Sequence, residues 1–216
     1  MTSPWNQRTV VALSILLAIT PVSLAYETPL RSNAIREAYF LGKRSDQKTS
    51  LFLGTYIKRM PLPENGAYIS DITLYTPYAQ VVLNSWMNSS EYSAQQAEKD
   101  YGAGDELIRV RVRIEFTPTY SAVQMKHDDD GSGQDVFVPR PETFWKDFRF
   151  ELIQENTVIL PRSDHAAPIY DDGGFRGAEV WQEYDAKNVP SEDTSVRVVT
   201  PDGQNVVAHF DLSTLR

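Results

Sequence analysis

The middle of the chain carries the clearest alternation of hydrophobic and polar residues. Between Leu107 and Thr117, five apolar residues alternate with four charged ones: Ile108, Val110, Val112, Ile114 and Phe116 with Arg109, Arg111, Arg113 and Glu115. Successive side chains of a β-strand point to opposite faces of the sheet. The segment is therefore predicted to be a strand with one buried face and one face in water.

The same two-residue period recurs on both sides of this strand. Further strands are predicted at 68–75, 148–153, 157–160, 178–184, 195–199 and 205–212. Asn156 and the Asp202-Gly203 pair supply the positive backbone angles that tight hairpin turns require. Ten residues are expected to form the core between two sheets: Ile108, Val110, Val112, Ile114, Phe116, Phe148, Phe150, Val196, Val198 and Phe210.

Helical spacing precedes the strands. Residues 26–63 are predicted to form a helical N-terminal appendage, with Thr28 capping a first helix, Gly42 ending it and Asp46 capping a second. Residues 64–216 are then a mainly β domain. The strands show no regular alternation with helices, which favours an antiparallel β-sandwich, immunoglobulin-like in outline, with one further short helix.

That further helix is expected at 89–101, while 79–86 fits either a strand or a helix. Residues 120–142 are polar and rich in glycine over much of their length, which predicts a long loop. Trp86 and Trp145 are interpreted as core or loop-packing residues.

The first 25 residues have the layout of a cleavable secretory signal. A leader with one arginine precedes an apolar run, Val10–Thr20, which Pro21 ends, and small residues lie before a cleavage point at Ala25. An uncleaved anchor is the alternative, but the run is shorter than the roughly 18 residues that span a bilayer. We expect residues 1–25 to be removed and no membrane span to remain.

Composition narrows the possible partners. The net charge is −8, so nucleic acid is not an expected partner. The chain has no cysteine, which excludes disulfides, zinc–thiolate sites and a thiol nucleophile. An exported, cysteine-free chain of this length fits a bacterial periplasmic or extracellular location.

The arginines of the central strand are the first candidate for a binding site. Arg109, Arg111 and Arg113 share one face at intervals of about 6.8 Å. They could bind a polyanion, or they could pair with carboxylates across the sheet. Glu179, Glu183 and Asp185 share one face of the strand at 178–184 and form a matching set, so the pairing is favoured.

Trp181 lies on the same face as those carboxylates. An exposed indole beside hydrogen-bond acceptors could bind a sugar, although a packed tryptophan is the commoner case. Glu183 and Asp185 would stand about 6.8 Å apart, near the lower limit for an inverting glycosidase. Both project to one side, whereas that reaction needs two carboxyl groups flanking the scissile bond.

Other catalytic and metal patterns fail on spacing. Ser163-Asp164-His165 holds the residue types of a hydrolase triad, but neighbours in one loop cannot converge as a triad does. An EF-hand alignment of the acidic stretch 128–135 places Lys126 and Phe137 where carboxylates are required, leaving a solvated loop or a weak calcium site. No catalytic residue, metal site or cofactor is expected.

The function predicted from these patterns is that of an exported, non-enzymatic β-sandwich that binds an envelope protein or a polysaccharide. Its candidate ligand-binding residues are Arg109, Arg111, Arg113, Trp181, Glu183 and Asp185. The alternative is a carbohydrate-binding module or weak glycosidase that uses Trp181 with Glu183 and Asp185.

Overall fold

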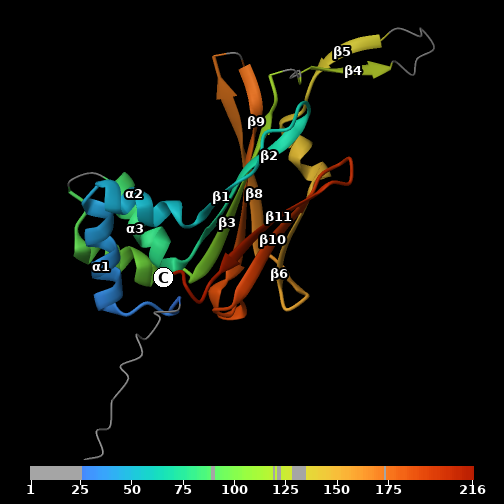
Figure 1. The fold of residues 1–216 in the computed structure, drawn as a ribbon. Coiled ribbons are helices and arrows are strands. Elements are labelled where there is room, and N and C mark those ends of the chain that lie inside the picture. Colours follow the sequence, from blue (N-terminus) through green and yellow to red (C-terminus); the bar gives the residue numbers. More distant parts are fainter. Residues whose placement is uncertain (1–25, 89–90, 119, 121–122, 128–134, 173) are drawn as a thin grey trace, which may run out of the picture.

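The computed structural model describes residues 26–88, 91–118, 120, 123–127, 135–172 and 174–216. The predicted leader, 1–25, and most of the acidic stretch, 128–134, lie outside the described residues. Figure 1 shows a helical layer at one end of two facing sheets. None of the helices in the described ranges is long and apolar enough to cross a bilayer.

The helices are α1 (Ser32–Lys43), α2 (Gln47–Gly54), α3 (Pro77–Met87) and α4 (Ala94–Ala103), with the 3₁₀ segments η1 (Glu142–Asp147) and η2 (Ala186–Asn188). The strands are β1 (Ile57–Arg59), β2 (Ala67–Tyr75), β3 (Leu107–Phe116), β4 (Val123–His127), β5 (Asp135–Pro139), β6 (Arg149–Gln154), β7 (Thr157–Ile159), β8 (Ser163–Asp171), β9 (Gly174–Asp185), β10 (Asp193–Val199) and β11 (Asn205–Asp211).

Two antiparallel sheets form the sandwich. The first has the strand order β1-β2-β3-β9-β8 and the second β11-β10-β6-β7, while β4 and β5 pair with each other as a separate ribbon. The predicted mainly β, antiparallel sandwich is confirmed. The strand orders do not confirm its immunoglobulin-like outline.

The core lies between the two sheets. Nine of the ten residues predicted to form it are buried, and the tenth, Phe150, is partly buried against the same cluster. Val112 of β3 faces Ile72 of β2 and Val180 of β9, and all three side chains are fully buried. The alternation of β3 therefore assigns its inner face correctly.

A second hydrophobic cluster holds the helices together. It joins residues of α1, α2, α3 and α4, among them Ala38, Leu53, Val82 and Ala97. The helical layer therefore draws on residues on both sides of the predicted boundary at residue 63. A Cβ atom on Gly42 would lie 2.3 Å from the carbonyl oxygen of Val82, so this glycine allows α1 to approach α3 closely.

The predicted helix ends are only partly correct. Asp46 caps α2 by accepting hydrogen bonds from the backbone N–H groups of Lys48 (2.9 Å) and Thr49 (3.2 Å), as predicted. Thr28 caps no helix, because α1 begins at Ser32 and the Thr28 hydroxyl donates to Glu106 instead. Gly42 lies inside α1, which ends at Lys43.

The undecided segment at 79–86 is helical, because Thr76 caps α3 and Pro77 occupies its first turn. The long loop predicted at 120–142 is wrong in part, since β4 and β5 pair within it. Ser163, Asp164 and His165, which were expected in one loop, lie in strand β8. Trp145 packs against the core as predicted, whereas Trp86 is 45% exposed and belongs to no core.

Two buried tyrosine hydroxyl groups join segments of the chain that lie far apart in the sequence. The Tyr26 hydroxyl donates to the carbonyl oxygens of Ala186 (2.6 Å) and Val189 (3.0 Å). The Tyr56 hydroxyl donates to the carbonyl oxygen of Arg216 at 2.7 Å. Both phenols lose most of their contact with water, and their protons are held by backbone acceptors.

Candidate functional site

The predicted site residues gather on the outer face of the five-stranded sheet, which points away from the second sheet. Cross-strand pairing places Arg109 opposite Glu183, Arg111 opposite Trp181 and Arg113 opposite Glu179. On the other side of β3, pairing with β2 places Tyr75, Thr73 and Asp71 opposite the same arginines. We call this surface, made of these nine residues with Glu115 and His165, the outer face.

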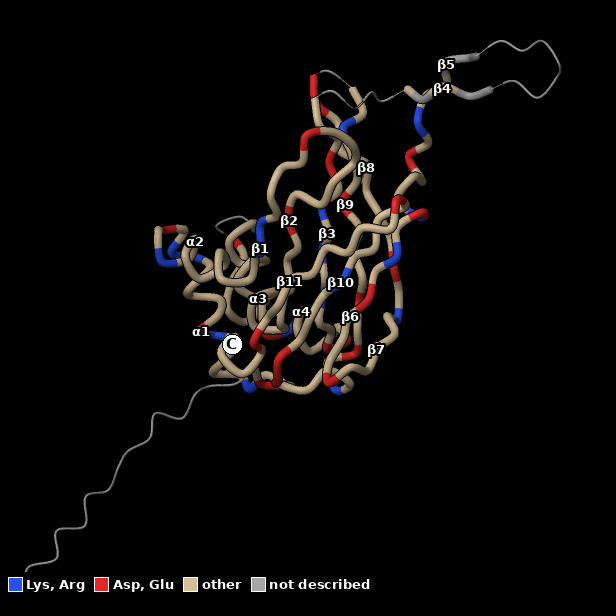
Figure 2. The backbone as a smooth tube through the Cα atoms, turned by 45° about the vertical axis from the view of Figure 1, so that its right-hand side comes forward, with Lys and Arg blue, Asp and Glu red and all other residues tan. Residues whose placement is uncertain are grey.

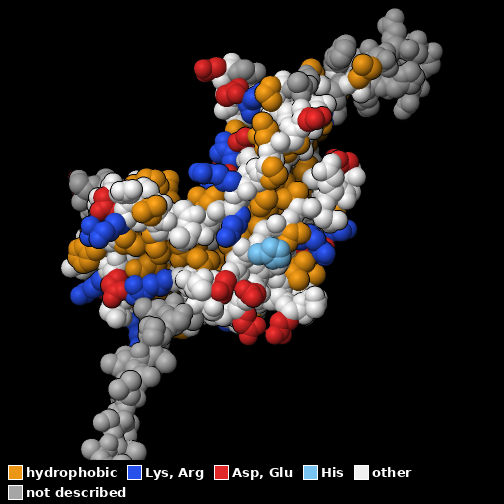
Figure 3. Space-filling view, viewed as in Figure 1, with side chains coloured by type: hydrophobic (Ala, Val, Ile, Leu, Met, Phe, Trp, Pro, Cys, Tyr) orange, Lys and Arg blue, Asp and Glu red, His pale blue; other side chains and the backbone are white. Residues whose placement is uncertain are grey.

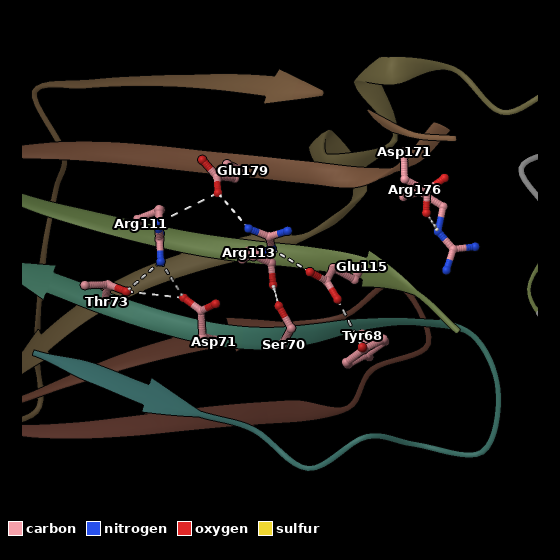
Figure 4. Close-up of polar contacts among 10 residues, drawn as sticks. All are labelled: Tyr68, Ser70, Asp71, Thr73, Arg111, Arg113, Glu115, Asp171, Arg176 and Glu179. Atoms are coloured by element: carbon pink, nitrogen blue, oxygen red, sulfur yellow. Dashed lines mark hydrogen bonds and ion pairs between the residues drawn. The ribbon is translucent and has the colours of Figure 1, made fainter. Parts of the chain in front are cut away.

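Arg111 lies at the centre of this face. Its Nη2 atom is 3.0 Å from Asp71 Oδ1 and 3.2 Å from Thr73 Oγ1, and its Nη1 atom is 3.8 Å from Glu179 Oε1. Figure 4 shows Arg111 between Glu179 on one side and Asp71 with Thr73 on the other. The guanidinium is held from both neighbouring strands.

Arg113 completes the network toward the end of β3. Its Nη1 atom is 3.2 Å from Glu179 Oε1, so Glu179 contacts two arginines, and its Nε atom pairs with Glu115 (Figure 4). Burial acts to lower the pKa of Arg113. The hydrogen bond and the charge of Glu115, together with the charges of Glu179 and Asp71, outweigh this effect, so the pKa of Arg113 lies above its usual value. Arg113 is therefore a permanent cation.

Arg109 and Glu183 form the pair at the other end of the row. Arg109 Nε is 3.0 Å from Glu183 Oε1, and the Ser163 hydroxyl donates to Glu183 Oε2 at 2.8 Å. Asp185 is not a partner of the arginine row, because its carboxylate lies 3.6 Å from Arg162. The favoured cross-strand pairing is thus confirmed for Glu179 and Glu183 and wrong for Asp185.

The charges of the outer face nearly cancel. Asp71, Glu115, Glu179 and Glu183 supply four negative charges against the three of the arginine row. Figure 2 shows residues of both signs along these strands. A face of balanced charge has little long-range attraction for a polyanion, since each arginine already has a carboxylate at contact distance.

Three aromatic rings cross the same face in nearly parallel planes. Trp181 lies between His165 of β8 and Tyr75 of β2, with ring centroids 6.4 and 6.1 Å apart and interplanar angles of 6° and 14°. The Arg111 guanidinium carbon is 5.9 Å from the centroid of Trp181. Tyr75 is buried, Trp181 is partly exposed and His165 is exposed, so the row runs from the body of the protein into solvent.

Sequence reasoning missed four members of this face: Asp71, Thr73, Tyr75 and His165. The first three alternate along a strand that was predicted, but their neighbours could be known only from the strand order. His165 was placed in a loop because β8 is exposed on both faces and lacks alternation. The signal that could have located β8 is the direct hairpin connection into β9.

No group of three or more histidine or carboxylate side chains among the described residues could hold a metal ion. Ser163 and His165 lie on one face of β8 and Asp164 on the other, so these neighbours form no triad.

Comparison with known proteins gives no relative from which a function could be transferred. No protein-family model matches the chain. A search of curated proteins found no similar sequence. The function must therefore be argued from the geometry of the outer face.

Proposed function

We propose that this chain is an exported, non-enzymatic binding module and that the outer face binds a protein of the cell envelope or extracellular space. The leader at 1–25 supports export to a bacterial periplasm or beyond. The observation that carries the binding role is the row of His165, Trp181 and Tyr75 laid across paired arginines.

The composition of this face suits a protein partner. Tryptophan, tyrosine and arginine are the residues that contribute most to binding energy in protein interfaces. The ion pairs of Arg109, Arg111 and Arg113 hold these side chains in place before a partner arrives. Less conformational entropy is then lost on binding.

Replacement of Trp181 tests this role. Immobilised wild-type protein is expected to retain a defined component of envelope extract, and Trp181→Ala is expected to lose it because the central ring of the row is gone. His165→Ala removes an exposed ring and should weaken retention without affecting the fold. Retention is measured by quantitative mass spectrometry, and folding by circular dichroism.

The matched control is His209→Ala, since His209 lies on β11 of the other sheet and contacts Ser195. It should bind as the wild type does. Equal retention by wild type, Trp181→Ala and His165→Ala would contradict the proposal. A further variant, with Arg109, Arg111 and Arg113 all replaced by Gln, tests for a polyanion site. Such a site would bind an acidic polysaccharide less tightly as the salt concentration rises, and only this triple variant would lose that binding.

A carbohydrate-binding module is the second candidate, and the parallel rings favour it. A row of flat side chains beside carboxylate acceptors can bind successive sugar rings. Retention of the wild type on an insoluble polysaccharide, lost in Trp181→Ala, would select this function. Hydrolysis has less support, because Glu183 is held by Arg109 at 3.0 Å and Asp185 lies 3.6 Å from Arg162, both on one side of any substrate.

A further inference from the structure

A cavity of about 650 Å³ lies at the end of the sandwich remote from the helices, well away from the centre of the outer face. Its walls come from the β1–β2 loop, residues 60–66, from η1, and from the β10–β11 turn, residues 200–206. Figure 1 shows these three segments side by side at that end. The volume is within the range of small-molecule sites, about 300–1,000 Å³.

The wall of the cavity is largely apolar. Met60, Phe144, Phe148 and Val206 line it, and Leu62 lies at its mouth with 66% of its surface exposed. Figure 3 shows hydrophobic side chains gathered between the β1–β2 loop and the β10–β11 turn.

Arg140 supplies a partly buried positive charge on this wall. Its guanidinium carbon lies 4.4 Å from the ring centroid of Tyr120 and 5.7 Å from that of Phe116. Its Nε atom is buried without a hydrogen-bond partner, and among the described residues no carboxylate forms an ion pair with it. The Nε atom of Arg111 on the outer face is also buried without a hydrogen-bond partner, but Arg109, Arg111 and Arg113 each have a carboxylate partner.

The two carboxylates that line this cavity, Asp147 and Asp202, are both exposed to solvent. Asp202 is exposed and bonds to the Thr200 hydroxyl and to Gln204 Nε2, the latter at 2.7 Å. Asp147 is exposed at the rim. The Nε–H group of Arg140, buried without an acceptor, carries a desolvation cost that a bound anion would offset.

We propose that this cavity binds a fatty acid, with the carboxylate on Arg140 and the acyl chain along Met60, Phe144 and Phe148. The apolar wall would accommodate the acyl chain, and the unpartnered Nε–H of the Arg140 guanidinium would bind a single negative headgroup. This site is independent of the function proposed for the outer face, so either proposal can fail alone.

Calorimetric titration of the purified protein with dodecanoate and with dodecanol tests the proposal. Dodecanoate should bind the wild type at least about tenfold more tightly than dodecanol, because only the acid forms the charged hydrogen bond with Arg140. Arg140→Gln should lose that difference, and Arg140→Lys should keep part of it. Arg197→Gln, which removes an arginine paired with Glu151 on the second sheet, is the matched control and should bind normally.

Leu62→Asp tests the site without replacing Arg140, in case the Arg140 variants do not fold. Leu62 is exposed, and its replacement adds a negative charge beside the cavity. It should weaken dodecanoate binding while leaving the thermal melt unchanged. Equal affinities of the wild type for dodecanoate and dodecanol, or undiminished dodecanoate binding by folded Arg140→Gln, would overturn the proposal. Binding of dodecyl phosphate in preference to dodecanoate would replace the fatty acid by a phosphate lipid.

Discussion

Val112→Asp is expected to leave no stably folded protein. Val112 is 0% exposed, at the centre of the inner face of β3. An unpaired carboxylate there would cost several kcal/mol, against a total stability of roughly 5–15 kcal/mol for a typical domain. The loss should be visible by circular dichroism as the absence of a cooperative thermal transition.

Val207→Asp makes the same chemical change at a position that is 40% exposed on β11. A surface replacement of this kind changes stability by about 0.5 kcal/mol or less, so its melt should resemble that of the wild type. A normal melt for both variants would show that the inner face of β3 is not the core of the sandwich.

Gly177→Ala is expected to destabilise the protein by about 3 kcal/mol or more, which is the sum of overpacking and of a strained backbone angle. Gly177 has φ +156°, and an added Cβ would lie 2.0 Å from the carbonyl oxygen of Ile114. Gly177 pairs with Glu115, so relief of this contact would separate β9 from β3. Urea unfolding measures the change.

Gly102→Ala is the matched control for this replacement. Gly102 lies in α4, and an added Cβ there would meet no atom within 4 Å. Alanine is the better helix former, so this variant should gain up to about 1 kcal/mol. Equal midpoints for the two variants would mean that β9 and β3 tolerate a wider spacing than the structure shows.

The sequence predicts the fold best where a strand has two unlike faces. β3 has the core on one side and water on the other, and its alternation therefore reports its orientation directly. β8 is an edge strand exposed on both faces, so burial imposes no period on it, and Pro168 is tolerated at such an edge. α3 was undecided because its short apolar run fits a strand or a buried helix equally well.

The candidate site could be predicted only strand by strand. Arg109, Arg111 and Arg113 share a face by periodicity alone, and their pairing with Glu179 and Glu183 followed once the two strands were taken as neighbours. Asp71 and Tyr75 could not be added, because nothing local in the sequence says that β2 lies on the other side of β3. Arg140 could not be identified from the sequence, because nothing local shows that it lines a cavity or that no described carboxylate pairs with it.

The buried phenols of Tyr26 and Tyr56 make the protein sensitive to alkali. Burial raises the pKa of each to about 12, whereas a phenol in the unfolded chain titrates near its ordinary value of about 10. Both hydroxyl groups keep their protons in the folded state after the unfolded chain has lost them, so stability is full below about pH 10 and falls as the pH rises toward 12. Urea unfolding at pH 9 and pH 11 should show this decline, and Tyr56→Phe should make it shallower. The buried phenols that stabilise the folded state in neutral solution thus contribute to its loss of stability in alkali.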